Sequence, residues 1–370
     1  MGYKWEKQMK ILQIHTKMVS GGIEAMVCNL SNELVKSHDV TLCTIFQPTE
    51  EDVFYCKLDS KVKKVTIGKK YFGFSVKEIW KIYRIISQGH YDVVHIHGCF
   101  QYYFLAIALL HSKVKFIYTI HSDARKENQA WDWKLFRLKK FMFSHRWMSP
   151  VTISYASQQS FEDLYHCKSN LIFNGIAKSQ YKYSSRNVVD EYRKTKLTKV
   201  FLHAGRISEP KNQLVLCKVF RKLVKEDLDV VLIIVGSLED KAIYASLQPY
   251  LSGRIVYLGE RNDVPELMAH ADAFCLPSLW EGLPVTLLEA LSVGCIPLCA
   301  PVGGIVNVIE SGKNGLLSKD TSEQEFFSTI KRFIEMTDEE RAIMKQNALI
   351  SFEKYNIKNC AKQYIKVYSE

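Results

Sequence analysis

The sequence predicts an α/β protein built from two doubly wound domains, each a parallel sheet with helices on both faces. Short β-rich runs alternate with helix-like segments along the whole chain, as parallel strands joined by helical crossovers require. The strand pattern stops at a polar stretch near the middle of the chain and then restarts. At 370 residues the chain also exceeds the size at which one hydrophobic core usually keeps growing.

The first domain is expected to span residues 1–172. Its first strand, KILQIHT, precedes a helix that begins near Ile23, and the later β-rich runs are DVTLCTIF, YDVVHIH (91–97), VKFIYTIH (114–121) and PVTIS (150–154). Beyond LIFNGI (171–176), the segment QYKYSSRNVVDEYRKTKLTK is polar and has no strand pattern. We therefore predict that this segment joins the two domains.

The second domain is expected to span residues 173–350. Its β-rich runs are KVFLHAG (199–205), DVVLIIVG (229–236), RIVYLG (254–259), DAFCLPS (272–278) and CIPLCA (295–300). From Asp338 to Tyr368 the chain has a helical pattern throughout. Residues 351–370 are predicted to form a C-terminal helix that packs back toward the first domain.

The composition is typical of a globular cytoplasmic protein. No run of 18 or more uncharged apolar residues occurs, and the charged start MGYKWEKQMK lacks the apolar core of a signal peptide. The ten cysteines have no zinc-site spacing, which predicts reduced core residues. Residues 1–172 hold 24 Lys and Arg against 15 Asp and Glu, whereas the rest hold 26 against 24. The basic first half fits an anionic membrane, an acidic or phosphorylated substrate, or nucleic acid.

Ligands of open parallel sheets lie beyond the carboxyl ends of the strands, so residues that follow the strands are candidate site residues. In SGGIEAMVCNL, Gly21 and Gly22 open a helix and allow backbone amides to approach a phosphate, although a plain tight turn explains them equally. In YTIHSD, His121 ends a strand and can donate to an oxyanion or a sugar hydroxyl, or serve as an ordinary hydrogen-bonded residue. His95 and His97, on the preceding strand, are expected to be structural.

The loop HAGRISEPKNQ places two cations, Arg206 and Lys211, just past the first strand of the second domain. A diphosphate suits this pair, because Arg can fork onto two oxygens and Lys acts as a mobile point charge. The alternative is a pair of solvated loop charges.

The stretch WEGLPVTLLEA places Glu281 and Glu289 on either side of the start of a predicted helix, with Pro284 in its first turn and Gly294 at its end. Each carboxylate can accept two hydrogen bonds and so suits a vicinal diol, and the amides of residues 282–285 lie between them. A sugar nucleotide presents a sugar diol, a diphosphate and a ribose diol in the same order. Alternatively, Glu281 only complements the helix dipole, worth about 0.3 to 1 kcal/mol, and Glu289 reaches solvent.

In this order, these loops resemble the retaining GT-B glycosyltransferases of family 4. The resemblance covers nearly the whole chain and rests on SGGIE, TIHSD, LIFNGI, HAGRISEPKN, LGERNDVPELMAHADAFCLPS and WEGLPVTLLEALSVGCIPLCAPVGGI. It implies a GT-B fold, in which two Rossmann-like domains face each other across a cleft, the first for the acceptor and the second for the donor. It implies an enzyme that transfers a sugar from a nucleotide-diphosphate sugar, with UDP-sugar favoured, to a saccharide or lipid-linked acceptor. The anomeric configuration of the sugar is retained.

The resemblance also implies residue roles. Glu281 matches the glutamate that contacts the donor sugar near the reacting centre, and Glu289 the one that holds the ribose hydroxyls. Arg206 and Lys211 match the pair that neutralises the diphosphate, and His121 the histidine that faces the donor sugar. The implied catalytic residues are thus Glu281, His121, Arg206 and Lys211, and the implied substrate-binding residues are Gly21, Gly22, Asn174, Arg261, Gly282, Leu283, Pro284, Val285 and Glu289.

Two positions depart from the family pattern. Asn174 and Gly175 begin an Asn-Gly-[Ile/Val]-Asp signature, but Ala177 replaces its aspartate. Ser122 follows His121 where many members have an aspartate. These departures predict an atypical environment on the acceptor side.

Cations and helix amides that neutralise the departing diphosphate make a metal unnecessary. The only Asp-x-Asp, Asp227 to Asp229, precedes a strand instead of following one, which argues against a metal-dependent mechanism. We therefore expect no metal and no other cofactor. In the family mechanism the departing phosphate assists deprotonation of the acceptor.

Cations mixed with aromatic residues in the first domain suit an anionic bilayer that carries a lipid-linked acceptor. They are Lys57, Lys61, Lys63, Lys64, Lys69, Lys70, Tyr71, Phe72 and Phe74, and the segment WDWKLFRLKKFMF (131–143), whose scattered bases suit an internal helix equally. The expected location is the cytoplasm, peripheral on the inner face of the membrane.

Two other functions fit the same residues. A sugar-nucleotide epimerase of the same architecture would consume the donor without an added acceptor. A non-catalytic protein that binds nucleotide sugars or nucleic acid would show no turnover, and its DNA binding would weaken steeply with salt. The leading prediction is the glycosyltransferase, with no nucleic-acid partner.

Overall fold

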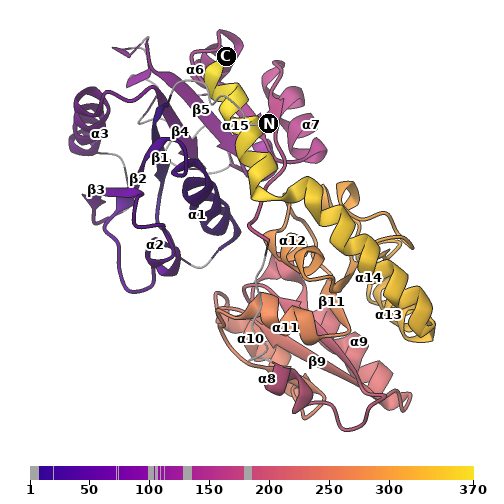
Figure 1. Cartoon of the computed structure of the whole chain (residues 1–370). Helices are drawn as coiled ribbons and strands as arrows, with labels where there is room; N and C mark the ends of the chain where they lie inside the picture. Colours follow the sequence, from indigo (N-terminus) through magenta and orange to yellow (C-terminus); the bar gives the residue numbers. More distant parts are fainter. Residues whose placement is uncertain are drawn as a thin grey trace. The chain divides into compact units, whose positions relative to one another are not determined.

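The computed structural model describes residues 8–19, 21–71, 73, 75–98, 104, 107, 108, 110, 111, 113–127, 136–178 and 186–370. Several residues discussed above, namely Phe72, Phe74, 131–135 and 180–185, lie outside this set. The chain divides into two compact units: Met1–Ala177 with Ile357–Glu370, and Lys178–Asn356 (Figure 1). We refer to them as the first and second units.

The sheet of the first unit has the strand order β3-β2-β1-β4-β5-β6-β7, and all its strands are parallel. The order reverses between β1 and β4, which makes the carboxyl ends of these two strands a topological switch point. The strands are β1 Lys10–His15, β2 Asp39–Phe46, β3 Lys63–Lys69, β4 Val93–His97, β5 Lys115–Ile120, β6 Ser149–Thr152 and β7 Asn170–Leu171.

Helices cover both faces of this sheet, because side chains alternate between its two faces along each strand. Ile11 packs in one core with α1 and α15, whereas Leu12 packs in the other with α3, α6 and α7. The helices are α1 Gly22–Leu34, α2 Val53–Cys56, α3 Val76–Gly89, α5 Ala124–Glu127, α6 Phe136–Ser144, α7 Tyr155–Tyr165 and α15 Ile357–Ser369. The C-terminal helix α15 thus completes the core of the first unit.

The second unit has a parallel sheet of order β10-β9-β8-β11-β12-β13, with its switch point between β8 and β11. Its strands are β8 Lys199–Ala204, β9 Val230–Val235, β10 Ile255–Tyr257, β11 Ala273–Leu276, β12 Ile296–Cys299 and β13 Leu316–Leu317. Its helices are α8 Arg186–Asp190, α9 Gln213–Lys225, α10 Lys241–Leu247, α11 Val264–His270, α12 Val285–Ser292, α13 Glu323–Glu335 and α14 Asp338–Phe352. The predicted class of two doubly wound α/β domains is confirmed.

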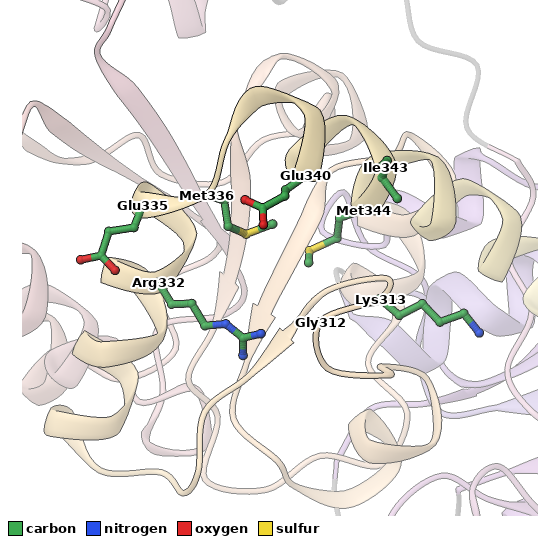
Figure 2. Close-up of a pocket in the computed structure, with 8 residues that line it drawn as sticks. All are labelled: Gly312, Lys313, Arg332, Glu335, Met336, Glu340, Ile343 and Met344. Carbon is green, nitrogen blue, oxygen red and sulfur yellow. The ribbon is translucent and has the colours of Figure 1, made fainter.

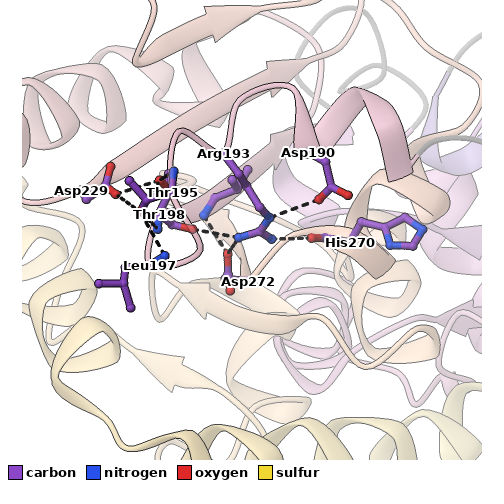
Figure 3. A network of polar contacts seen from close by, with 9 residues as sticks. Asp190, Arg193, Thr195, Leu197, Thr198, Asp229, His270 and Asp272 are labelled. Atoms are coloured by element: carbon purple, nitrogen blue, oxygen red, sulfur yellow. Dashed lines mark hydrogen bonds and ion pairs between the residues drawn. The ribbon is translucent and has the colours of Figure 1, made fainter.

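A polar network anchors the segment that enters the second unit (Figure 3). The guanidinium of Arg193 donates to a carboxylate oxygen of Asp272 and to the carbonyl of Thr198, both at 2.8 Å. Asp229 accepts hydrogen bonds from the hydroxyls of Thr195 and Thr198 and pairs with Arg254 at 2.6 Å. The second aspartate of the Asp-x-Asp is therefore part of this structural network.

The prediction of a continuous helix from Asp338 to Tyr368 is wrong at residues 353–356. Helix α14 ends at Phe352, a short 3₁₀ turn covers Glu353–Tyr355, and Asn356 is extended. The amide of Ile357 then donates to the carbonyl of Ile176 at 2.8 Å instead of to a preceding turn. The break redirects the chain from the second unit into the first.

The basic cluster predicted around residues 57–70 is also partly structural. Lys63, Lys64 and Lys69 belong to strand β3, which the sequence analysis did not identify. Lys69 is buried, and its ammonium lies 3.8 Å from the carboxylate of Glu78. Lys69 is therefore not a surface cation for a membrane.

Candidate active site

The candidate site of the second unit is formed by loops at the carboxyl edge of its sheet. The loop after β8 and the loop after β11 are joined by two hydrogen bonds, from the amide of Leu279 to the carbonyl of Pro210 at 2.9 Å and from the side chain of Asn212 to the carbonyl of Pro277 at 3.1 Å. Asn212 has a left-handed backbone conformation at the start of α9. The two loops lie together because β8 and β11 are neighbours at the switch point.

Lys211 and Glu281 form an ion pair in this site. The ammonium of Lys211 lies 2.5 Å from Oε1 of Glu281, and the side chains are only 17% and 10% exposed. The buried hydroxyl of Ser278 donates to the same oxygen at 2.7 Å. Both donors use Oε1, so Oε2 is the oxygen to which a ligand hydroxyl can donate. The sequence predicts the cation and the carboxylate, but neither their pairing nor the role of Ser278.

The other two predicted cations have acidic partners that the sequence does not reveal. Arg206 pairs with Glu239 at 2.9 Å, and both side chains are about half exposed. Such a pair contributes little to stability, so Arg206 can exchange this carboxylate for a ligand oxygen at small cost. Arg261 instead makes two hydrogen bonds with Asp263, at 2.8 and 2.7 Å, and both side chains are half-buried. This fork fixes the guanidinium of Arg261.

Two glycines allow the loops of this edge to approach each other. Gly303 has a φ of +54°, and a Cβ there would collide with the carbonyl of Glu281. The next amide, of Gly304, donates to the carbonyl of Gly282 at 2.6 Å. Gly236 likewise faces the carbonyl of Gly205. The backbone that carries Glu281 is therefore packed directly against the segment after β12.

Helix α12 begins at Val285, so Pro284 precedes the helix instead of lying in its first turn, as the sequence predicted. Pro284 is extended and serves as the N-cap, and its carbonyl accepts from the amide of Leu287 at 3.2 Å. Leu283, Pro284 and Val285 are buried and Gly282 is half-buried. Glu289 is half-buried in the second turn of the helix, and its carbonyl accepts from the hydroxyl of Ser292.

A neutral histidine lies beneath Lys211. Burial, together with the nearby charge of Lys211, lowers the pKa of His203 to about 4. His203 Nδ1 lies 2.9 Å from the carbonyl of Cys275, so it carries the proton and donates it. Its Nε2 accepts from the side-chain amide of Gln213, which also donates to the carbonyl of Arg206. His203 and Gln213 therefore hold in place the loop that carries Arg206 and Lys211.

In the first unit, Gly21 is the N-cap of α1, and its backbone is extended. The space beside Gly21 is occupied by the carboxylate of Glu24, which lies 3.3 Å from Nε2 of His15. The carboxylate of Glu24 thus lies at the start of α1, where Gly21 and Gly22 were predicted to let a phosphate approach.

The other two predicted residues of the first unit are buried. His121 is 6% exposed, and its Nε2 lies 3.1 Å from Nδ1 of His97. Asn174 is buried next to Gly175, where a Cβ would lie 2.5 Å from the Cβ of Cys360 in α15. The Asn-Gly dipeptide therefore allows α15 to pack closely against the chain.

A hollow of about 360 Å³ in the second unit contains none of the predicted residues (Figure 2). It lies among α13, α14 and the loop at Gly312, and its charged lining residues are Lys313, Arg332, Glu335 and Glu340. Across the part of the chain that the structure describes, no group of three His, Cys, Asp or Glu side chains could hold a metal ion. No helix in that part combines the length and apolar character needed to cross a membrane.

Comparison with known proteins relates both units to sugar transfer. Residues 185–350 match the family described as Glycosyl transferases group 1, and residues 20–180 match Glycosyltransferase Family 4. The chain is 24% identical over 336 residues to the Escherichia coli UDP-Gal:alpha-D-GlcNAc-diphosphoundecaprenol alpha-1,3-galactosyltransferase, covering 87% of this chain and 82% of that protein. A segment of 137 residues, 37% of this chain and 36% of the relative, is 33% identical to the N,N'-diacetylbacillosaminyl-diphospho-undecaprenol alpha-1,3-N-acetylgalactosaminyltransferase of Campylobacter jejuni.

The fold is also found among solved structures. Anabaena HepE, crystallised with UDP and glucose, superimposes with a TM-score of 0.81 at 19% identity, covering 98% of this chain and 100% of HepE. Two parallel-sheet α/β units with this order of strands form the GT-B fold that the sequence predicted. Since the two family matches together span nearly all of both units, the chain belongs to the family 4, group 1 glycosyltransferases of GT-B fold.

Proposed function

We propose that this glycosyltransferase moves a sugar, with retention and without a metal, from a UDP-sugar to a saccharide or lipid-linked acceptor in surface polysaccharide or glycolipid synthesis. The observation that carries the proposal is the ion pair of Lys211 and Glu281 at the switch point of the second sheet. It puts a cation for a diphosphate and a carboxylate for a sugar hydroxyl next to each other.

The reaction follows from these charges. The bond between the anomeric carbon and the diphosphate oxygen breaks, and a bond forms from the acceptor oxygen to that carbon on the same face. The proton of the acceptor hydroxyl goes to the departing phosphate oxygen. Lys211 has three N–H donors, so it can contact Glu281 and the diphosphate at once, and Arg206 adds a second cation by leaving Glu239.

The remaining roles are assigned from position. Glu281 accepts from a donor-sugar hydroxyl through Oε2, and Glu289 in α12 binds the ribose hydroxyls. The amides at the start of α12 face the diphosphate. Arg261, held by Asp263, borders the base. Within the first unit, we assign substrate contacts to Gly21, Gly22, His121 and Asn174.

The named activities of relatives support the choice of substrates. The Escherichia coli relative uses UDP-galactose and an undecaprenol-linked acceptor by its name, and HepE was crystallised with UDP-glucose. By analogy, we assign a UDP-sugar as donor and a polyprenyl-diphosphate-linked saccharide as acceptor. The enzyme would then work at the cytoplasmic face of a membrane.

An exposed face of α3 supports a membrane-bound position of the first unit. Val76, Trp80 and Tyr83 project from this helix with exposed fractions of 69%, 56% and 38%. The guanidinium of Arg84 lies 4.7 Å from the Trp80 ring, and Lys77 is exposed on the same helix. Aromatic residues beside cations suit the interface of an anionic bilayer. We assign this α3 face, defined by Val76, Lys77, Trp80, Tyr83 and Arg84, to lipid contact.

The donor is tested by thermal denaturation with UDP-, GDP- and ADP-sugars, because a ligand that binds the folded state raises its stability. The stabilising sugar nucleotide is then incubated with polyprenyl-diphosphate-linked acceptors, with and without EDTA. We expect a product whose anomeric configuration, measured by NMR, is that of the donor, and no effect of EDTA. Donor conversion without an acceptor would favour an epimerase, and an inverted product would refute retention.

A further inference from the structure

The segments that follow β8 and β9 are held together by backbone hydrogen bonds. The amide of Ile207 donates to the carbonyl of Ser237, and the amide of Asp240 donates to the carbonyl of Ile207, both at 2.9 Å. Ile207 itself is fully buried. Arg206 and Glu239 lie next to these residues in the chain, so their backbone positions are fixed relative to each other.

The two acidic residues of the segment after β9 have different partners. Asp240 caps α10, because one of its carboxylate oxygens accepts hydrogen bonds from the amides of Ala242 and Ile243 at 2.8 and 3.1 Å. The carboxylate of Glu239 instead reaches the neighbouring segment, where its Oε1 lies 2.9 Å from a terminal nitrogen of Arg206. The acid that this segment offers to a cation is therefore Glu239.

The pair of Arg206 and Glu239 is looser than the pair of Arg261 and Asp263 at the same edge of the sheet. Asp263 holds the guanidinium of Arg261 by two hydrogen bonds, one to each carboxylate oxygen. Glu239 accepts one hydrogen bond from Arg206, and both side chains are about half exposed. A carboxylate that orients an arginine is expected to use both oxygens. The single, exposed hydrogen bond indicates a pair that opens easily.

A diphosphate and the carboxylate of Glu239 compete for the same guanidinium. Arginine binds phosphate groups best when two of its N–H groups donate to two oxygens at once. At Arg206 this arrangement either breaks the hydrogen bond to Glu239 or holds a second anion beside the carboxylate, which repels it. Both outcomes weaken the binding of a diphosphate.

We propose that Glu239 is an internal competitor of nucleoside diphosphates: its carboxylate occupies Arg206 in the free enzyme and weakens the binding of both the donor and the nucleoside diphosphate that remains after transfer. Glu239 then promotes product release, because it takes back the guanidinium as the product departs. This inference rests on the proposed function, in which Arg206 binds the diphosphate. Removal of the Glu239 carboxylate should tighten binding, whereas removal of a group that orients Arg206 would weaken it.

The sign of this effect is measured by isothermal titration calorimetry on the full-length protein. UDP, GDP and ADP are titrated into the wild-type protein, and the nucleotide that binds most tightly is then used for the variants. We expect Glu239→Gln to lower its Kd about twofold to fivefold, the equivalent of one exposed ion pair. The corresponding nucleoside, which has no diphosphate, should bind both proteins equally. Unchanged or weaker binding of the nucleotide by Glu239→Gln would overturn the proposal.

A double-mutant cycle with Arg206→Gln tests whether Glu239 acts through Arg206. We expect the gain in affinity from Glu239→Gln to disappear when Arg206 is already replaced, since no guanidinium is left to compete for. A gain that persists in the Arg206→Gln protein would refute the competition, because Glu239 would then act by repelling the nucleotide in general.

Glu209 provides a matched control for the lost charge. It is exposed, lies three positions from Arg206 in the same loop, and forms no ion pair with any residue that the structure describes. Glu209→Gln removes the same charge from the same loop, and we expect it to change the Kd by less than about twofold. An equal gain in Glu209→Gln would mean that the net charge of the loop sets the affinity, which excludes a specific role of Glu239.

Turnover measurements show the consequence for the product. We expect the nucleoside diphosphate to inhibit Glu239→Gln at a concentration about twofold to fivefold lower than it inhibits the wild-type enzyme. If the wild-type protein binds none of the three nucleotides, the proposed function is refuted together with this inference. If the wild-type protein binds one of them and Glu239→Gln binds it no more tightly, only the role of Glu239 is refuted.

Discussion

The ammonium of Lys211 lies 2.5 Å from Oε1 of Glu281, although the two residues are 70 positions apart in the chain. We expect Lys211→Ala or Glu281→Gln to lower kcat/KM by about 100- to 1000-fold, because each removes a charge next to the reacting groups. Glu289→Ala should mainly raise the KM for the donor. Both effects are measured by donor turnover with a saturating acceptor.

The control for this pair is Lys313→Ala, which removes the exposed ion pair of Lys313 with Glu310. That variant should keep full turnover, since exposed pairs contribute little. Circular dichroism and thermal denaturation show that each variant is folded. Wild-type turnover by folded Glu281→Gln would contradict the assigned role.

Ser278→Ala is expected to lower kcat/KM about threefold to tenfold, because Glu281 loses one of the two donors to its Oε1 while keeping Lys211. Ser292→Ala is the matched control. Ser292 is equally buried, but its hydroxyl donates to the carbonyl of Glu289. A loss of activity of the same size in both variants would mean that Ser278 acts only through stability.

Gly303→Ala should lower the free energy of unfolding more than Gly312→Ala does. Both glycines have a positive φ, of +54° and +87°, so alanine costs about 1 to 2 kcal/mol at either position. Only at Gly303 would the added Cβ also collide with the carbonyl of Glu281, whereas at Gly312 the nearest atom is 3.4 Å away at the end of Arg332. Urea denaturation measures the difference, and equal losses would contradict the close approach.

The protein should lose stability as the pH falls below about 6.5. Burial lowers the pKa of His95 and His97 well below that of free histidine, and that of His121 and His203 to about 3 and 4. Below pH 6.5 the unfolded chain therefore binds more protons, and each such histidine costs about 1.4 kcal/mol of stability per pH unit until its folded pKa is reached. Above pH 6.5 this contribution is fully present. Melting temperatures between pH 7.5 and 5 test the slope, and His97→Gln should reduce it while the exposed His145→Gln should not.

The α3 face predicts selective binding to anionic vesicles. We expect sedimentation with vesicles that contain phosphatidylglycerol, weaker binding to pure phosphatidylcholine, and a loss of about tenfold or more in Trp80→Ala/Tyr83→Ala. Trp147→Ala is the control, since Trp147 is also exposed in the first unit but follows α6. Stronger dependence on Trp147 than on Trp80 would move the lipid contact to that segment.

Apolar runs in the sequence were sufficient to predict most strands. DVTLCTIF is β2 residue for residue, and the predicted runs at 199–205 and 229–236 contain β8 and β9. Strand β3 could not be predicted from its sequence KKVTIGK, because three of its seven residues are lysines. β3 lies at the edge of the sheet and is only partly buried, so it tolerates these charges. β7 and β13 have two residues each, too few for a pattern.

The individual site residues could be proposed from the sequence, but their partners could not. Lys211 and Glu281 meet because β8 and β11 are neighbours, a pairing that depends on the order of strands in the sheet. Ser278 and His203 lie within apolar strand patterns that resemble any buried segment. The burial of His121 against His97 likewise depends on the register of β4 and β5, in which His97 pairs with Thr119.

The return of α15 to the first unit has a consequence for synthesis on the ribosome. The first unit begins at the N-terminus, yet Tyr364 and Tyr368 of its core belong to the last helix, which is translated after the whole second unit. We expect the second unit to complete its fold first. The first unit is synthesised earlier, but part of its apolar core stays exposed to solvent until α15 is made. Protease protection of arrested nascent chains should therefore appear in residues 178–356 before it appears in the segment that precedes them.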